Sequence, residues 1–104
     1  MSAFLALWND LAPGEKAAYE AWHTREHVPE RVAAPGFRLG RRYVAPGHPR
    51  HRWFTLYDLD GLGALETPEY RDLLANPTPA SAAMRPKLRD VLRAPCAEVG
   101  GAGA

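Results

Sequence analysis

The break at Pro35-Gly36 constrains this chain more than any other feature, because it joins a helical pattern directly to a strand pattern. Residues 13–33 have the composition and spacing of a helix, and residues 37–45 alternate as a strand does. With so short a connection, the strand must run back beside the helix that it follows. The same stretch, residues 20–43, concentrates the side chains that could carry chemistry.

The rest of the chain continues the alternation of strands and helices. We expect strands at residues 3–9, 37–45, 50–58 and 87–99, helices at about 13–33 and 61–75, and a further helical turn at 81–84. Thr67 fits an N-cap with Pro68 at the first helical position, and Pro95 interrupts the last strand. This is the split βαβ order of a ferredoxin-like α+β fold, with a four-stranded antiparallel sheet covered by helices on one face.

The first helix is expected to be amphipathic and kinked. Pro29 removes a backbone donor and should loosen the helix around residues 25–27. The helical wheel predicts one stripe that packs on the sheet, made of Ala18, Ala21, Trp22, Val28, Pro29 and Val32. The buried side of the second helix should hold Tyr70, Leu73 and Leu74.

Aromatic residues occur on both faces of the hairpin predicted at residues 37–58. The first strand should carry Phe37, Leu39, Arg41 and Tyr43 on one face, and Arg38, Gly40, Arg42 and Val44 on the other. Since helices cover only one face of the sheet, we expect a homodimer with the two sheets face to face. At 104 residues the chain is expected to form one domain, residues 1–99, with a flexible tail at 100–104.

Charge and cysteine content narrow the partners and the compartment. A net charge of +1 gives no overall attraction to nucleic acid or membrane, although six arginines and no acid lie between residues 31 and 57. The consensus strand of RNA-recognition domains is absent from FRLGRRYV. The lone Cys96 suits a reducing compartment, and the apolar start is too short for a signal peptide or a membrane span. We therefore expect a cytoplasmic protein without nucleic-acid or membrane partners.

The stretch W-H-x-x-E-H-V-P-E-R-x-x-x-P-G-F-x-x-G-R-R-Y resembles the helix-to-strand signature of EthD-like members of the dimeric α/β barrel superfamily. The resemblance rests on His27 before Pro29, on the break at residues 35–37 and on the strand residues 41–43, and it extends to about Met84. It implies a ferredoxin-like dimeric α/β barrel with a ligand cleft between the helices and the sheet of each subunit. It does not imply one reaction, since cofactor-independent monooxygenases, haem-degrading enzymes, isomerases and dehalogenase-like proteins are all similar to this fold.

His23 and His27 are four residues apart, which places their rings one helical turn apart. With Glu26 or Glu30 they could form a zinc or iron site, or they could lie on a solvated polar face; the spacing alone favours the solvated face, and we predict no metal site. A kink at Pro29 could instead turn His27 toward the cleft as a general acid or base, and the resemblance supports that role.

The neighbouring strand could complete such a site. Arg41 and Tyr43 would offer a cation and a phenol to a carboxylate or phenolate ligand, which makes Tyr43 the second catalytic candidate after His27. The substrate-binding candidates are His23, Glu30, Arg41, Trp22, Trp53 and Tyr57. The alternatives are that Arg41 pairs with Glu30, and that the aromatic residues form sheet core or dimer interface.

The sequence therefore predicts a small-molecule-binding protein. As an enzyme it would be a monooxygenase, an isomerase or an EthD-like protein that needs no tightly bound cofactor and acts on an aromatic or carboxylated compound. Two alternatives stay open at this point. One is a non-catalytic structural or binding homodimer, and the other is a haem- or metal-dependent enzyme.

Overall fold

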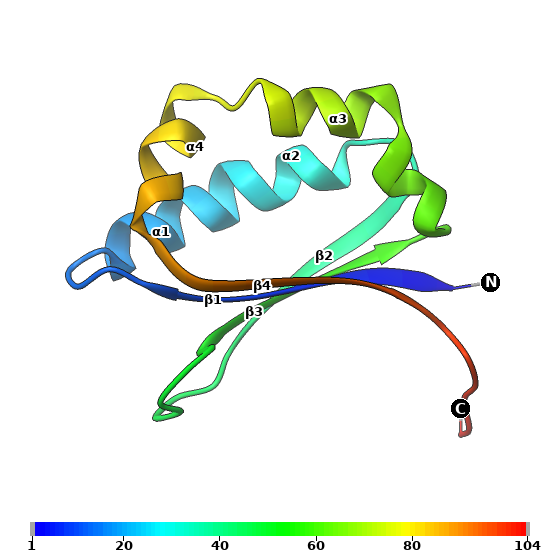
Figure 1. Ribbon diagram of the computed structural model, residues 1–104, viewed down its shortest axis with the longest axis horizontal. Coiled ribbons are helices and arrows are strands. Elements are labelled where there is room, and N and C mark those ends of the chain that lie inside the picture. Colours follow the sequence, from blue (N-terminus) through cyan, green and yellow to red (C-terminus); the bar gives the residue numbers. More distant parts are fainter. Residues whose placement is uncertain (1, 104) are drawn as a thin grey trace.

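A sheet and a layer of helices stack on each other in the computed structural model, which describes residues 2–103 (Figure 1). The strands are β1 (Ala3–Leu11), β2 (Phe37–Val44), β3 (Trp53–Leu59) and β4 (Leu88–Ala97). They form one antiparallel sheet in the order β2-β3-β1-β4. The helices are α1 (Lys16–Trp22), the π-helical turn η1 (His23–His27), α2 (Val28–Val32), the 3₁₀ turn η2 (Leu62–Glu66), α3 (Pro68–Ala75), α4 (Pro79–Met84) and the 3₁₀ turn η3 (Arg85–Lys87). The helices cover one face of the sheet, so the predicted ferredoxin-like α+β fold is confirmed.

The first helix runs without a break through α1, η1 and α2, and its middle turn is widened. The Val28 N–H donates to the His23 carbonyl, an i→i+5 bond that defines a π turn. Pro29 follows directly and has no N–H to give to the carbonyl of Arg25, which favours a wider turn over a regular α-helical one. The predicted loosening around residues 25–27 is therefore confirmed, and it takes the form of a π turn.

The widened turn changes which side of this helix faces the sheet. Tyr19, His23, Val28 and Arg31 are buried, whereas Ala18, Ala21 and Pro29, which the wheel placed on the buried stripe, are exposed. An extra residue in one turn keeps positions four apart on the same face, so Tyr19, His23 and His27 line up. The prediction that the histidines lie on a solvated face is wrong for this reason.

A β-bulge changes the faces of β2 in a similar way. Phe37 pairs with Leu59 but Leu39 pairs with Asp58, so Arg38 is an extra residue in the ladder. Beyond the bulge the alternation is reversed, and Gly40 and Arg42 point toward the helices. Arg41 and Tyr43 therefore lie on the opposite face, and their predicted position beside Phe37 is wrong.

Local signals place the later elements as predicted. Thr67 caps α3 by accepting a hydrogen bond of 3.2 Å from the Tyr70 N–H, with Pro68 at the first helical position. The last strand is present, but Pro95 does not interrupt it and pairs in register with Leu5. β4 lies at the edge of the sheet, where a residue without an N–H is tolerated.

The core lies between the two layers, and the far face of the sheet is open. In the core the Phe37 ring contacts those of Tyr57 and Tyr70, at 5.6 and 5.3 Å between centroids. On the far face, Trp8 pairs with Phe54 and with Leu92, and the rings of Trp8 and Phe54 are 4.9 Å apart. Within residues 2–103, no helix covers these apolar side chains. Each helix of this described part is too short or too polar to span a bilayer.

Candidate functional site

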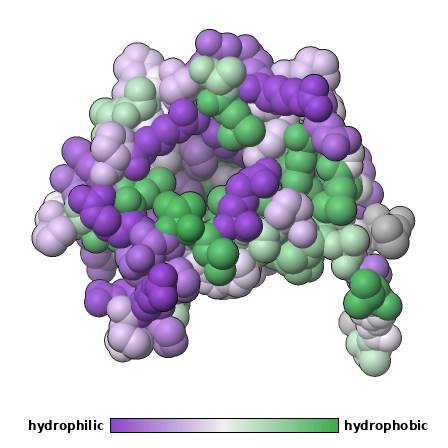
Figure 2. All heavy atoms as spheres, viewed as in Figure 1, coloured by the Kyte–Doolittle hydropathy of each residue, from purple (hydrophilic) through white to green (hydrophobic). Residues whose placement is uncertain are grey.

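A cavity of about 440 Å³ lies between the helix layer and the sheet. Figure 2 shows it as a hollow between the two layers, with both apolar and polar side chains at its rim. The first helix forms one wall, β1 and β3 form the floor, and α3, η3 and β4 surround the mouth. Leu74, which the sequence placed in the core, is 44% exposed at this mouth. The volume is in the range of small-molecule sites.

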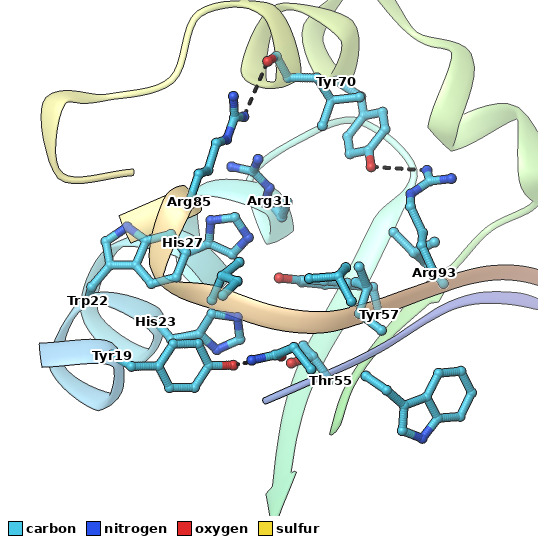
Figure 3. A pocket seen from close by; sticks show the side chains of 17 residues that line it. Tyr19, Trp22, His23, His27, Arg31, Thr55, Tyr57, Tyr70, Arg85 and Arg93 are labelled. Atoms are coloured by element: carbon cyan, nitrogen blue, oxygen red, sulfur yellow. Dashed lines mark hydrogen bonds between the residues drawn. The ribbon is translucent and has the colours of Figure 1, made fainter. Parts of the chain in front are cut away.

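Three rings from the first helix stack along one wall of the cavity (Figure 3). The Tyr19 and His23 rings are 4.9 Å apart and 17° from parallel, and the His23 and His27 rings are 5.1 Å apart and 18° from parallel. The Trp22 ring lies 4.5 Å from His27, and its Nε1–H donates to Ser81 Oγ on α4. The π turn therefore builds an aromatic wall in which His27 is held between Trp22 and His23.

Arg42 holds His23 in one tautomer. Its Nε–H donates to His23 Nδ1 over 2.5 Å, so in a neutral ring the proton must be on Nε2. The remaining guanidinium nitrogens donate to Thr24 Oγ1 and to Glu20 Oε1, which locks the arginine in place. His23 is thus a fixed neutral hydrogen-bond donor beside His27.

Both histidines are neutral at physiological pH. Burial, together with the positive charges of Arg42 and Arg31, lowers the pKa of His23 to about 3. Burial likewise lowers the pKa of His27 to about 2, with Arg31 as the next cause. An uncharged imidazole can accept a proton, and additional negative charge in the cavity would raise the pKa and favour that step.

Two buried polar atoms have no hydrogen-bond partner among residues 2–103: Nδ1 of His27 and the hydroxyl of Tyr57. Tyr57 rises from β3, is 1% exposed, and its hydroxyl points into the cavity in Figure 3. Gly40 allows this placement, because a Cβ there would lie 3.1 Å from the Tyr57 ring and 2.7 Å from Val28 Cγ1. Unpaired polar atoms are uncommon in a folded interior, so these two are candidates for contact with a ligand.

The structure brings together only part of the predicted site. Trp22, His23, His27 and Tyr57 line the cavity. Trp53 is on the same side of the sheet, with its ring 5.4 Å from that of Tyr19 and 5.9 Å from the Arg42 guanidinium carbon. It supports the aromatic wall from outside the cavity lining.

Three predicted site residues lie elsewhere. Glu30 accepts a hydrogen bond from Arg31 and is absent from the cavity lining. Arg41 and Tyr43 lie on the open face of the sheet, because the bulge at Arg38 reverses the faces of β2 beyond it. The geometry therefore separates these two side chains from His27.

Sequence reasoning missed most of the polar groups of the cavity. The missed residues are Tyr19, Arg31, Arg42, Tyr70, Arg85 and Arg93, of which Arg42 acts through His23 and the others line the cavity. One signal was present: a glycine inside a strand pattern, here Gly40, often marks a bulge or a close approach of backbone and side chain. A bulge at this point would have predicted that Arg42, and not Arg41, faces the helices.

The acids near the histidines are engaged with other partners. Glu26 accepts from Thr78 Oγ1 over 3.0 Å, and Glu30 accepts from Arg31 over 2.6 Å. In the part of the chain that the structure describes, no three His, Cys, Asp or Glu side chains are grouped so as to hold a metal ion.

No protein-family model and no curated protein sequence matches this chain. Solved structures do match it. A dimeric ferredoxin-like protein from an uncultured marine organism aligns with a TM-score of 0.69 at 11% identity, over 100% of this chain and 94% of that one. An EthD-family protein of Bacillus halodurans aligns with a TM-score of 0.61 at 19% identity, over 90% of this chain and 96% of that one.

A third structure comes from Chloroflexus aurantiacus and is an antibiotic biosynthesis monooxygenase-like protein. It aligns with a TM-score of 0.57 at 19% identity, over 98% of this chain and 96% of that one. Identities this low establish a common fold and nothing finer. The expected resemblance to EthD-family and related ferredoxin-like proteins is thus confirmed for the fold.

Proposed function

We propose that this protein binds an aromatic or carboxylated small molecule in the cavity and that His27 moves a proton on it, without a tightly bound cofactor. The observation that carries the proposal is the unpaired Nδ1 of His27 in a largely apolar cavity. The reaction would be of the kind suggested by the names of the similar structures, an EthD-family protein and an antibiotic biosynthesis monooxygenase-like protein.

The four predicted residues that line the cavity each have a role in this proposal. His27 accepts the proton, and a ligand that becomes anionic raises the pKa of His27 as the proton moves. His23, held by Arg42, donates its Nε2–H toward the ligand. Trp22 contacts the ligand body, and the Tyr57 hydroxyl faces its polar end. Tyr43 and Arg41 are on the other face of the sheet and have no role at this cavity.

The variant His27→Ala is expected to keep the fold and to weaken binding. One edge of the ring already borders the cavity, so its removal enlarges an existing space and leaves no new buried polar atom unpaired. We expect the affinity for 1-naphthoate, measured by isothermal titration calorimetry, to fall about tenfold through the lost ring contact. On a substrate that the protein converts, the loss of a general base should lower the rate by a factor of roughly 10²–10⁴.

The matched control for this test is His48→Ala, which changes an exposed histidine in the β2–β3 loop. It should leave both the melting temperature and the affinity unchanged. If His27→Ala binds 1-naphthoate as tightly as the wild type, His27 does not contact the ligand and the assignment is wrong. A thermal melt of each variant shows whether the fold is retained.

We also propose that two chains associate through their open sheet faces. Tyr43 is 49% and Leu92 is 48% exposed on this face, next to Trp8 and Phe54. Large apolar side chains gathered on one open face are typical of an interface. The similar protein from the marine organism is itself described as dimeric.

The variant Phe54→Glu should separate the two subunits. Phe54 contacts both Trp8 and Tyr43, so a carboxylate there would lie at the centre of a desolvated patch. Light scattering should give twice the 11.5 kDa chain mass for the wild type and a single chain mass for the variant. Leu62→Glu, at an exposed leucine in the helix layer, is the matched control and should stay dimeric. A wild-type protein that is monomeric at micromolar concentration contradicts the proposal.

A further inference from the structure

The unpaired hydroxyl of Tyr57 shows which end of the cavity is polar. It is buried, it has no partner among residues 2–103, and the ring is held by Phe37 at 5.6 Å. Figure 3 shows the hydroxyl directed toward the centre of the cavity, on the same side as His27 and Arg31. A phenylalanine would fill the same space without an unpaired group, so a hydroxyl here is best accounted for by a ligand atom that accepts its hydrogen bond.

Arg31 supplies positive charge at the same end. It lies on α2, is 5% exposed and lines the cavity. In the described chain, one bond of its guanidinium is seen, from Nη1 to Glu30 Oε1. An arginine has five N–H donors in a planar fork that suits a carboxylate or a phenolate. The Arg31 charge also acts on both neighbouring groups. It opposes protonation of His27, and it offsets part of the effect of burial, which raises the pKa of Tyr57.

The charge of the whole lining has one sign. Three arginines line the cavity, Arg31, Arg85 and Arg93, and none of the lining residues, all within residues 2–103, carries a carboxylate. Arg85 donates to the Leu74 carbonyl and Arg93 to the Tyr70 hydroxyl, so neither is neutralised by an acid there. Glu30 offsets part of the Arg31 charge, and Arg85 and Arg93 keep the lining net positive, which favours anions over cations.

The remainder of the lining is apolar. Leu5 and Leu7 of β1 and Leu88 of β4 line the cavity together with Trp22 and the histidine rings of the first helix. A planar aromatic body can pack against the ring edges of this wall while its charged end reaches Arg31. A volume of about 440 Å³ accommodates a compound of two or three fused rings.

We propose that the cavity takes an aromatic compound bearing one oxyanion, and that this oxygen is bound between the Arg31 guanidinium and the Tyr57 hydroxyl. This assignment rests on the small-molecule function proposed above and names its ligand class. The oxyanion can be a carboxylate or a phenolate, because both present an oxygen that accepts from Arg31 and Tyr57.

Isothermal titration calorimetry with three probes tests the proposal. The probes are 1-naphthoate, the neutral 1-naphthalenemethanol with the same ring system, and 2,4-dinitrophenolate. The wild type should bind 1-naphthoate at least about tenfold more tightly than the alcohol, as a charge-assisted hydrogen bond requires. The affinity of the phenolate relative to the naphthoate shows which oxyanion the site prefers.

Two variants assign the effect to the named groups. Arg31→Met should remove the preference for the anion, and Tyr57→Phe should weaken 1-naphthoate binding about fivefold while leaving the alcohol unaffected. Tyr57→Phe should also raise the melting temperature by a few degrees, because it removes a buried unpaired hydroxyl. Arg38→Met, at an exposed arginine of β2, is the control and should change neither affinity.

The outcomes separate this inference from the proposed function. If the probes bind but the wild type prefers the alcohol, or if Tyr57→Phe and Arg31→Met keep the preference for the anion, the oxyanion assignment is overturned and the small-molecule function stands. If none of the three probes binds, both fail together. Should Arg31→Met not fold, Tyr57→Phe alone decides, since it preserves the shape of the core.

Discussion

Between pH 7 and pH 5 the free energy of unfolding is expected to fall by about 4 kcal/mol. The cause is the pair of buried histidines, His23 and His27, whose pKa values in the folded protein are about 3 and about 2. In the unfolded chain a histidine has a pKa of about 6.5. At pH 5 the unfolded state therefore binds about two more protons than the folded state.

The sign and the size follow from this difference in bound protons. Stability rises with pH wherever the unfolded state binds more protons. The protein therefore has its full stability above about pH 7 and loses stability as the pH falls below about 6.5. At pH 5 each histidine lowers the free energy of unfolding by about 2 kcal/mol. This loss hardly changes for any folded pKa below about 4. The rings stay uncharged because they are buried and because the positive charges of Arg31, Arg42 and Arg85 are nearby.

Urea unfolding curves at pH 7, 6 and 5 measure this effect, and thermal melts should show a decrease of roughly 15–30 °C. His27→Gln should halve the dependence on pH, and His23→Gln combined with His27→Gln should abolish it. His48→Gln, at the exposed histidine, should reproduce the wild-type dependence. A wild type that is equally stable at pH 5 and pH 7 would show that the rings are accessible to protons in the folded state.

Gly36→Ala is expected to lower the free energy of unfolding by about 3–4 kcal/mol. Gly36 has φ of +85°, where an alanine is strained by about 1–2 kcal/mol. A Cβ at this position would also lie 2.6 Å from Ala64 Cβ and 3.2 Å from Ala64 Cα, so η2 would have to move. The Gly36 carbonyl accepts from the Asp60 N–H over 2.8 Å, which ties this turn to the end of β3.

Two other glycines separate strain from crowding. Gly14 has φ of +82° and nothing within 4 Å of an added Cβ, so Gly14→Ala should show the backbone strain alone. Gly61 has an extended backbone and open space, so Gly61→Ala should have little effect. In urea unfolding, Gly36→Ala should lose the most stability, Gly14→Ala less, and Gly61→Ala the least. Equal losses of stability for Gly36→Ala and Gly14→Ala would mean that η2 moves away from the added Cβ without a loss of free energy.

The element order and the local signals could be predicted from the sequence, because they depend on neighbouring residues. Thr67 and Pro68 begin α3 where an N-cap and a first-turn proline should. The break at residues 34–36 separates α2 from β2, and Pro29 marks the weakened turn of the helix. His27 was singled out through the resemblance to EthD-like proteins; it lines the cavity, and its catalytic role stays a prediction.

The faces of the elements were decided only by the tertiary structure. A shift of one residue reverses every side chain of a strand, and the bulge at Arg38 made that shift, which put Arg42 in place of Arg41. One extra residue in the π turn carried His23 and His27 from the solvent to the cavity wall. Such shifts are set by the fit of the helix against the sheet, here through Gly40 against Val28 and Tyr57, and the local pattern of residues does not contain that fit. Arg31, Arg85 and Arg93 meet at one cavity for the same reason, since α2, η3 and β4 are brought together by the fold alone.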